Sequence, residues 1–355
     1  MSFIWFALIL SVLILVHEFG HFVMARRLGV RVDYFSLGFG PKIFGWKKGE
    51  TEYRLSLVPV GGYVKMAGEE AAGASGVGEP WEYLSKPVWA KASIVAAGPS
   101  VNYLMAFFLF FFIFATGNPQ SSNKVGQVIE NFPAETAGLK AGDRVLAVAG
   151  QATPYWEDVQ RLISNHLEGG TLPFEVEREE RRFTLSIVPK VVEQKDLLGK
   201  LQRRAAIGIY PSDEVIFVRY SIPEAAGKAL NQLVSLTTMT LKALGKLVTG
   251  GLPMKESLTG PIGIFFITQK AARLGIPYLL QVCAILSASL AIFNFLPIPA
   301  LDGGHLFFLG LEALKGRPIS ERVQELSRQV GFYFLIGLMV FVLYNDLIRW
   351  FGGVR

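Results

Sequence analysis

Four long apolar stretches constrain this chain of 355 residues more than any other feature. A helix needs about 20 apolar residues to cross the hydrocarbon core of a bilayer. The candidate stretches are Phe3 to Ala25, Ala92 to Thr116, Tyr278 to Leu301 and Val330 to Tyr344, of which the last is short, though Leu347 and Trp350 can extend it. Charged residues make up 18% of the chain, below the roughly 25% that is usual in soluble domains. The sequence therefore predicts a polytopic α-helical membrane protein with about four transmembrane helices, and it excludes a disordered chain.

The basic residues beside these stretches predict the side on which each loop lies. Lys and Arg gather between the first two stretches and between the last two, and short positively charged loops stay in the cytoplasm. We therefore expect the N-terminus and the region from Gly117 to Pro277 on the opposite side. No basic residue precedes the first stretch and no small-residue cleavage pattern follows it, so we interpret it as a retained anchor.

The region between the second and third stretches divides into two parts. Residues 122–211 alternate apolar and polar positions between Gly- and Pro-containing turns, which predicts an inserted β-rich domain. Residues 212–277 hold a connector and a helix from Ala225 to Thr249, and its lysines fall within about 40° of one another on a helical wheel. These lysines are Lys228, Lys242 and Lys246. Such a stripe favours a helix in the membrane interface, and a fifth span is the alternative.

The first stretch contains a cluster of three ionisable residues: His17, Glu18 and His21. Two histidines one helical turn apart project from one face and can reach the same Zn²⁺, while Glu18 beside them can accept a proton from water. Each such group costs about 2 to 3 kcal/mol on membrane-insertion scales, so it rarely persists without a use. The cluster predicts a metal site, and a buried polar packing network is the alternative.

A catalytic zinc site needs a third protein ligand and one open position. Cys283 is the single cysteine and builds neither a disulfide nor a thiolate cluster, and His166 falls in the β-rich region. The candidates near membrane depth are Asp302, His305, Glu312 and Asp346. Prolines and glycines interrupt the helix between Asn294 and Gly304, next to Asp302. Broken helix at membrane depth lines a protein cavity, where an active site would lie.

These residues resemble the site-2 protease family of intramembrane zinc metallopeptidases, and within it the bacterial regulator of sigma-E protease group. The resemblance covers most of the chain and rests on His17-Glu-Phe-Gly-His21, Gly98-Pro-Ser-Val-Asn102, and Asn294 to Gly304 with its Leu-Asp-Gly sequence. It implies that His17, His21 and Asp302 bind Zn²⁺ and that Glu18 activates the water. It implies further that Asn294 contacts the substrate backbone or the developing oxyanion. His305 follows the motif without being a family ligand.

The resemblance also assigns regions of the chain. Residues 1–117 would hold transmembrane helices 1 and 2, residues 122–211 a single PDZ-like domain, residues 212–277 the interfacial helix and connector, and residues 278–355 helices 3 and 4. Tyr53 to Met66 has a hairpin-like pattern and would form a membrane re-entrant β element that presents an edge to substrate, with an ordinary cytoplasmic hairpin as the alternative. PDZ domains bind extended peptides or free C-termini by strand addition. A size filter for bulky substrates is equally compatible.

We therefore predict an intramembrane zinc metalloprotease of the bacterial inner membrane, with its site near the cytoplasmic side and the PDZ-like domain on the periplasmic side. Its partners would be single-span membrane proteins such as anti-sigma factors or signal-peptide remnants, a peptide ligand of the PDZ-like domain, and the bilayer. The net charge of +6 is dispersed, so no nucleic acid is expected. The alternatives are a catalytically inactive PDZ-bearing binding protein, against which the intact Glu18 argues, and a metal transporter.

Overall fold

The chain folds into two compact units, which are described separately. A computed structural model describes residues 2–69, 78–167, 169–195, 199, 201–254 and 258–351. The membrane unit comprises residues 1–113, 226–241 and 254–355, and the β-rich unit comprises residues 114–225 and 242–253.

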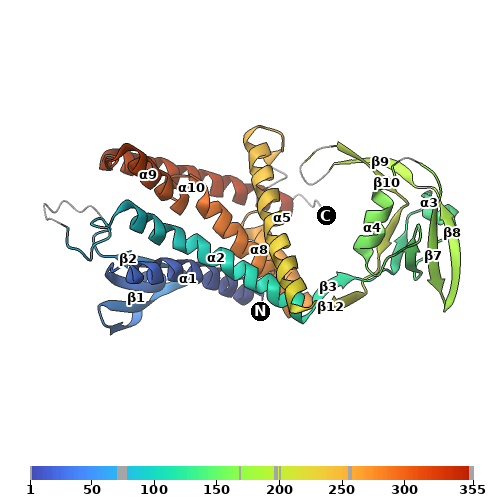
Figure 1. Ribbon diagram of the computed structural model, residues 1–355, viewed down its shortest axis with the longest axis horizontal. Helices are drawn as coiled ribbons and strands as arrows, with labels where there is room; N and C mark the ends of the chain where they lie inside the picture. The colour runs from blue at the N-terminus through green and yellow to red at the C-terminus, as the bar shows by residue number, and fades with distance from the viewer. Residues whose placement is uncertain are drawn as a thin grey trace. The chain divides into compact units, whose positions relative to one another are not determined.

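Four helices are long and apolar enough to cross a bilayer, as the sequence predicted (Figure 1). They are α1 (Ser2–Arg27), α2 (Val88–Thr116), α8 (Ile276–Phe295) and α10 (Glu321–Phe351). The third helix ends at Phe295, six residues before the predicted end at Leu301. Pro297 and Pro299 lack backbone donors, so a regular helix cannot continue through them. Side chains of α1 and α8, among them Leu13 and Cys283, share a buried apolar cluster.

Besides the helices of the β-rich unit, the described residues form three further helices between these spans. The helix predicted from Ala225 to Thr249 is α5 (Ile222–Val248), which is not one of the four candidate spans. Its first turn is fixed by a capping box between Ser221 and Glu224. The helices α7 (Pro261–Leu274) and α9 (Asp302–Lys315) were not predicted, because each is too short to give a membrane-spanning signal.

The segment between α1 and α2 forms two long antiparallel strands, β1 (Val32–Lys48) and β2 (Thr51–Met66). Residues Tyr34 to Leu37 of β1 each have two partners in β2; Phe35, for example, pairs with both Val64 and Tyr53. The prediction that Tyr53 to Met66 folds back on itself as a hairpin is therefore wrong. The segment belongs to one strand, β2, and its paired residues all pair with β1. Its final residues lie beside α1, where the Val64 amide donates to Glu18.

The β-rich unit contains a four-stranded antiparallel sheet in the order β6-β5-β7-β8 and three further strand pairs. The sheet strands are β5 (Arg144–Val148), β6 (Gln151–Ala152), β7 (Leu172–Arg178) and β8 (Arg181–Ile187). The pairs are β4 (Val125–Val128) with β11 (Ile209–Pro211), β9 (Lys190–Lys195) with β10 (Leu201–Ala206), and β3 (Asn118–Ser121) with β12 (Val215–Val218). Two helices, α3 (Pro133–Thr136) and α4 (Trp156–Ser164), complete the unit.

The core of the β-rich unit follows from the alternation in its sequence. In β7 the side chains of Leu172, Phe174 and Val176 are buried and those between them are exposed. The amphipathic helix α4 adds Trp156 and Val159 to the same apolar cluster. The β-rich character predicted for this region is confirmed.

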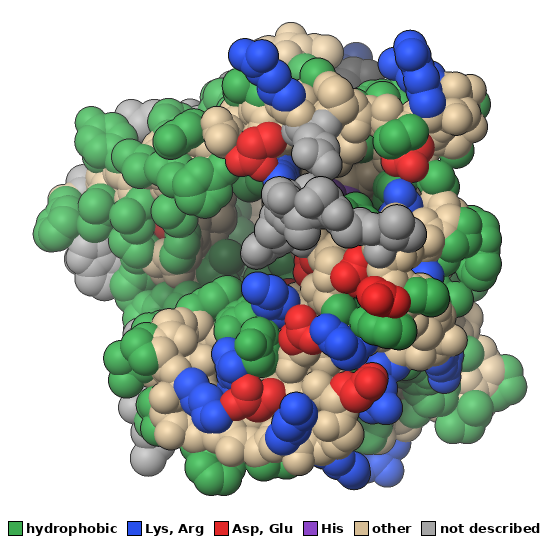
Figure 2. Space-filling model, turned by 90° about the vertical axis from the view of Figure 1, so that its left-hand side faces the viewer, with side chains coloured by type: hydrophobic (Ala, Val, Ile, Leu, Met, Phe, Trp, Pro, Cys, Tyr) green, Lys and Arg blue, Asp and Glu red, His purple; other side chains and the backbone are tan. Residues whose placement is uncertain are grey.

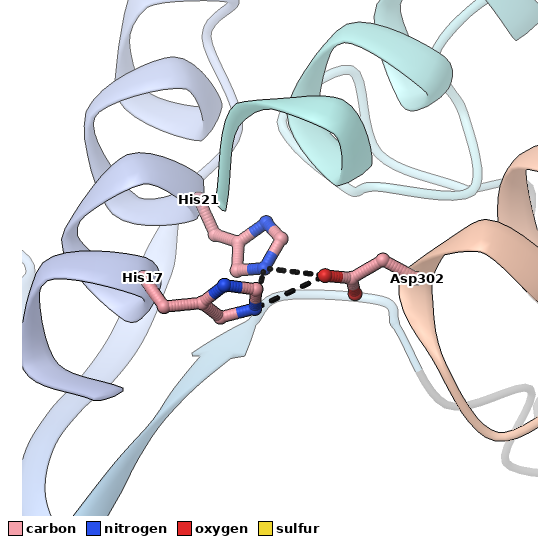
Figure 3. Close-up of side chains that lie close together, drawn as sticks. All are labelled: His17, His21 and Asp302. Carbon is pink, nitrogen blue, oxygen red and sulfur yellow. Dashed lines mark hydrogen bonds and ion pairs between the residues drawn. The ribbon is translucent and has the colours of Figure 1, made fainter. Parts of the chain in front are cut away.

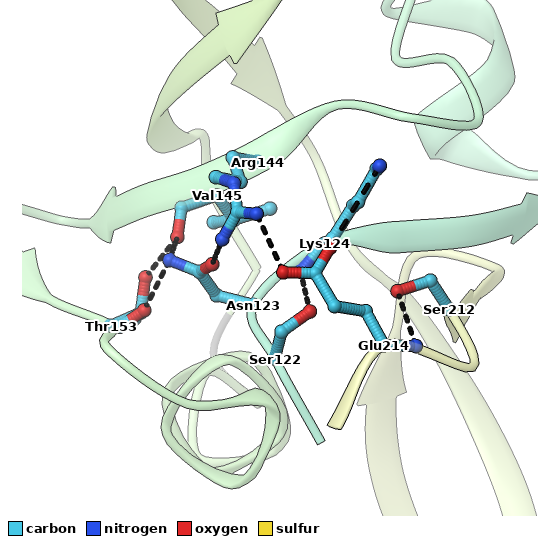
Figure 4. A network of polar contacts seen from close by, with 8 residues as sticks. All are labelled: Ser122, Asn123, Lys124, Arg144, Val145, Thr153, Ser212 and Glu214. Atoms are coloured by element: carbon cyan, nitrogen blue, oxygen red, sulfur yellow. Dashed lines mark hydrogen bonds and ion pairs between the residues drawn. The ribbon is translucent and has the colours of Figure 1, made fainter. Parts of the chain in front are cut away.

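A polar network holds the beginning and the end of the β-rich unit side by side (Figure 4). The Ser122 amide donates to the Glu214 carbonyl at 2.9 Å, and the Ser212 amide donates to the Lys124 carbonyl at 3.0 Å. The Arg144 guanidinium binds the Glu214 carboxylate at 2.7 Å. These contacts join the segment that enters the β-rich unit after α2 to the segment that leaves it before α5.

Candidate active site

Two helices far apart in the sequence bring three metal-binding side chains together. His17 and His21 project from α1, and Asp302 opens α9 (Figure 3). Asp302 Oδ2 lies 3.0 Å from His17 Nε2 and 3.5 Å from His21 Nε2, and the two Nε2 atoms are 3.2 Å apart. Both histidines are buried, at 8% exposure each. The three potential ligand atoms therefore form a small triangle inside the membrane unit.

The triangle has the dimensions of one face of a zinc coordination sphere. Ligand atoms at about 2.0 to 2.1 Å from Zn²⁺ in a tetrahedron lie ~3.3 Å from one another, and the three separations are 3.0, 3.2 and 3.5 Å. Asp302 Oδ2 is also buried without a hydrogen-bond partner among the described residues. A carboxylate oxygen that faces two imidazole nitrogens fits a cation at their centre. The fourth position of the tetrahedron is left for water or substrate.

Close packing of α1 on α2 fixes His21. Its Nδ1 donates to the Ile94 carbonyl at 2.9 Å, because a carbonyl can only accept, so its Nε2 carries the lone pair that faces Asp302. A methyl group on Gly98 would lie 2.3 Å from His21 Nε2, and one on Gly20 would lie 2.5 Å from the Ala97 carbonyl oxygen. These two glycines let the helices approach closely enough for His21 to reach the site.

The Leu-Asp-Gly-Gly sequence is explained by a chain reversal that places Asp302. Between α8 and α9 the backbone folds back over the first turn of α9, and Ala300 takes the left-handed conformation with φ 78°. A Cβ on Gly303 would lie 2.0 Å from the Leu296 carbonyl oxygen, and one on Gly304 would lie 2.5 Å from that of Ile298. Only glycine fits at both positions. The reversal turns the carboxylate of Asp302 towards α1.

Glu18 lies beside the triangle and is held by β2. Its Oε2 accepts a hydrogen bond from the Val64 amide at 3.1 Å, and the side chain lines the same cavity as the two histidines. A carboxylate held next to a metal position, but outside the ligand triangle, is placed to accept a proton from water.

A cavity of about 1000 Å³ extends from the triangle towards one end of the membrane unit. Its far lining includes the exposed residues Arg322, Glu325 and Arg328, so the cavity opens to the surface there. Figure 2 faces this end and shows acidic and basic side chains gathered around a hollow. His305 also lines the cavity, and burial lowers the pKa of its imidazole, which favours the neutral ring.

The other candidate carboxylates have partners of their own. Glu312 forms an ion pair with Lys91 at 3.3 Å, which joins α9 to α2. Asp346 accepts the amides of Gly260 and Gly263 at 3.1 and 3.0 Å and so caps the beginning of α7. Neither belongs to the triangle, and among the four candidates of the sequence only Asp302 joins the two histidines.

Two further residues of the sequence analysis lie outside the triangle: His166, which it set aside as a ligand, and Asn294, which it expected to contact substrate. His166 is half-buried in the β-rich unit. Asn294 occupies the last turn of α8 and is half-buried, and it is not among the described residues that line the cavity. Its expected contact with substrate stays a prediction.

Sequence reasoning missed the groups that hold these side chains in place. The Ile94 carbonyl and the Val64 amide are backbone atoms, which leave no side-chain signature. The ion pair of Lys91 with Glu312 joins positions 221 apart in the chain. The sequence offered two signals for this pair: Lys91 at the start of one predicted span, and Glu312 after the Leu-Asp-Gly motif.

Known proteins are similar in sequence to this chain along nearly its whole length. The pattern of peptidase family M50 matches residues 5–338. A relative from Agrobacterium fabrum that is named as a zinc metalloprotease is 35% identical, over 98% of this chain and 96% of that one. The regulator of sigma-E protease RseP of Escherichia coli is 32% identical over 98% of this chain and all (100%) of that one. The regulator of sigma-W protease RasP of Bacillus subtilis is 30% identical over 98% of each chain.

One match among solved structures falls on part of the chain. The crystal structure of a PDZ domain from a Listeria monocytogenes SdrC-like protein covers 26% of this chain and 90% of that one, with 22% identity and a TM-score of 0.22. The family match, by contrast, spans both motifs of the ligand triangle. The chain therefore belongs to peptidase family M50, as a multi-pass site-2 type zinc metalloprotease of the bacterial inner membrane.

Proposed function

We propose that this protein cuts single-span membrane proteins within their transmembrane segments, with His17, His21 and Asp302 as its Zn²⁺ ligands. One observation carries this assignment. Two imidazole nitrogens and one carboxylate oxygen converge within 3.5 Å of one another at membrane depth, with Glu18 beside them. Ionisable groups in hydrocarbon are costly, and a bound cation offsets that cost.

The residues around the triangle have separate roles in peptide hydrolysis. When bound, Zn²⁺ supplies a Lewis acid that polarises the scissile carbonyl and makes water more acidic. Glu18 accepts the proton of the attacking water and passes it to the leaving amine. The amide of Asn294 donates to the oxyanion that develops on the substrate. The cavity supplies water, because its lining contains charged side chains down to the exposed end.

The substrate must reach the site as an extended chain. A transmembrane helix satisfies its own carbonyls, whereas an extended segment can pair with a strand. The end of β2 lies beside Glu18 through the Val64 amide, so a segment aligned along it would pass close to the triangle. We propose that β1 and β2 form the membrane re-entrant element that presents this edge. Relatives named as regulators of sigma-factor proteases suggest membrane-bound anti-sigma factors as one class of substrate.

The charges at the cavity mouth support a topology. Arg322 and Arg328 line the exposed end and lie at the beginning of α10, and Lys and Arg gather on the cytoplasmic side of membrane spans. We propose that the site opens to the cytoplasm. The β-rich unit, as a PDZ-like domain, then lies in the periplasm, where it binds a peptide or screens substrates by size, and α5 lies in the membrane interface.

The experiment that tests the function is cleavage of a truncated single-span substrate by purified protein in detergent. Glu18→Gln keeps the shape of the side chain but cannot accept a proton, so we expect no product while the protein retains about one zinc per chain. Glu325→Gln is the matched control, because Glu325 is an exposed acidic residue of the same cavity, and it should cleave at the wild-type rate.

Two outcomes would contradict the assignment. Loss of zinc from Glu18→Gln would make Glu18 a ligand rather than a base. Wild-type cleavage by Glu18→Gln, or cleavage that survives complete removal of zinc by a chelator, would exclude the mechanism.

A further inference from the structure

Asn102 is a fully buried side chain of α2 that the hydrolytic mechanism does not use. It is 0% exposed, and its Nδ2 lies 3.5 Å from His17 Nδ1. Its Oδ1 is buried with no hydrogen-bond partner among the described residues. A buried amide oxygen without a donor costs about 1 to 3 kcal/mol, so the pairing of this side chain needs an explanation.

The tautomer that a metal requires supplies the missing donor. For His17 Nε2 to present a lone pair to a cation, the proton of the neutral ring must sit on Nδ1. That N–H would face Nδ2 of Asn102, which is also a donor. The two ends of an amide have nearly the same shape, and turning it over places Oδ1 opposite His17 Nδ1. Both the orphaned oxygen and the clash of donors are then removed.

We infer that Asn102 is a positioning residue for the metal site: its Oδ1 accepts the Nδ1–H of His17 and fixes the tautomer and orientation of that ring. The inference rests on the proposed role of His17 as a ligand. It gives His17 the same kind of support that His21 receives from the Ile94 carbonyl at 2.9 Å. Groups behind metal-bound histidines commonly act in this way.

The spacing on α2 shows how one helix serves both rings. Ile94, Gly98 and Asn102 follow one another at intervals of four residues, so they share one helical face. Ile94 accepts from His21, Gly98 leaves room for the His21 ring, and Asn102 faces His17. This face of α2 is therefore shaped to hold the two imidazoles of α1.

Asn102 is itself held from the other side by α8. Ser287, which is 0% exposed, donates its hydroxyl to the Asn102 carbonyl at 2.8 Å. That contact involves only the backbone carbonyl of Asn102 and not its side-chain amide. Removing it therefore tests the packing at this position without changing the proposed contact with His17. Ser287 supplies a control at the same depth in the protein.

The test measures zinc affinity of the full-length protein in detergent by competition with a chelator, and the visible spectrum of the Co²⁺-substituted protein. Asn102→Leu keeps the size but removes the acceptor, and we expect about 10- to 100-fold weaker zinc binding and an altered Co²⁺ spectrum. Asn102→Asp restores an acceptor and should recover most of the affinity. Ser287→Ala removes a buried hydrogen bond but should leave affinity within about threefold of wild type.

His17→Ala separates failure of this inference from failure of the proposed function. If His17→Ala loses zinc while a folded Asn102→Leu binds it as tightly as wild type, the inference is wrong and the ligand assignment stands. If His17→Ala retains wild-type affinity, the ligand assignment itself is wrong. Equal losses in Asn102→Leu, Asn102→Asp and Ser287→Ala would reduce Asn102 to a packing role and overturn the inference. Thermal unfolding of each variant in detergent shows which of them fold.

Discussion

Each unit of the molecule contains a carboxylate largely withdrawn from solvent, and the two are satisfied in opposite ways. In the β-rich unit, Asp143 is 0% exposed and both its oxygens accept from Arg178, at 2.6 and 2.7 Å. The Lys140 amide adds a third hydrogen bond at 2.8 Å. In the membrane unit, Asp302 Oδ2 faces two imidazole nitrogens and has no hydrogen-bond partner among the described residues.

The difference separates a structural carboxylate from a ligand. Asp143 has its counter-charge inside the protein, so it can be buried without any other group. No Lys or Arg pairs with Asp302 among the described residues, and a cation bound beside the two imidazoles would supply its counter-charge. Asp346 resembles Asp143 rather than Asp302, since two backbone amides satisfy its oxygens. The pairing of a buried acid therefore tells more about its role than its burial does.

Asp302→Asn should produce the largest effect on metal binding. The amide has the size of the carboxylate but no charge and weaker affinity for Zn²⁺, so a ligand is lost. We expect zinc affinity to fall more than about 100-fold, beyond the usual range for groups behind the ligands, and cleavage to become undetectable. Zinc content and chelator competition on the purified protein measure it.

Asp346→Asn is the matched control for that prediction, because it changes another buried acid of the membrane unit outside the triangle. It should keep zinc and cleavage while lowering the unfolding temperature slightly. Zinc loss in Asp346→Asn, or full zinc in Asp302→Asn, would break the distinction between the two kinds of acid.

Asp143→Asn should lower the stability of the β-rich unit without affecting zinc binding. It removes the charge that pairs with the half-exposed Arg178, so we expect the β-rich unit to lose about 2 to 4 kcal/mol of stability, between the values for exposed and buried pairs. Zinc content should not change. Hydrogen exchange of the full chain, followed by mass spectrometry, should show β5 and β7 exchanging at least about 30-fold faster and α1 unchanged; faster exchange confined to α1 would refute it.

The sequence predicted the parts of the site that a local pattern encodes. His17 and His21 are four residues apart, so helical periodicity alone places them on one face. Asp302 follows two prolines and precedes two glycines, and that composition indicates a chain reversal at the end of a span. The four spans were predictable for the same reason, because length and apolar composition suffice to define them.

What the sequence left open depends on pairing between distant segments. Nothing in the pattern of β2 indicates that its partner is β1 rather than its own second half. The choice of Asp302 over Asp346 depended on Gly260 and Gly263, whose amides approach Asp346 only after α7 and α10 pack. Hydrogen bonds from backbone atoms and contacts across hundreds of residues carry no local signal.

A half-buried acid of the β1–β2 segment gives the smallest expected effect. Glu52 accepts from Arg54 at 2.6 Å and also from Lys42, and these hydrogen bonds lower its pKa to about 2. Because the folded value lies below the ordinary 4.5, the pairs contribute stability above that pH and lose it progressively as the pH falls towards about 2.

The measurement is the difference in unfolding temperature between the wild type and Glu52→Gln as a function of pH. We expect about one or two degrees at neutral pH, with the difference shrinking between about pH 4.5 and pH 2 and weakening in high salt, because exposed pairs are screened. A difference that does not change with pH would show that the pairs leave the Glu52 pKa at its ordinary value. If the predictions hold, the effect of removing an acid increases from the half-buried Glu52, through the fully buried and paired Asp143, to Asp302, and only Asp302 alters zinc binding.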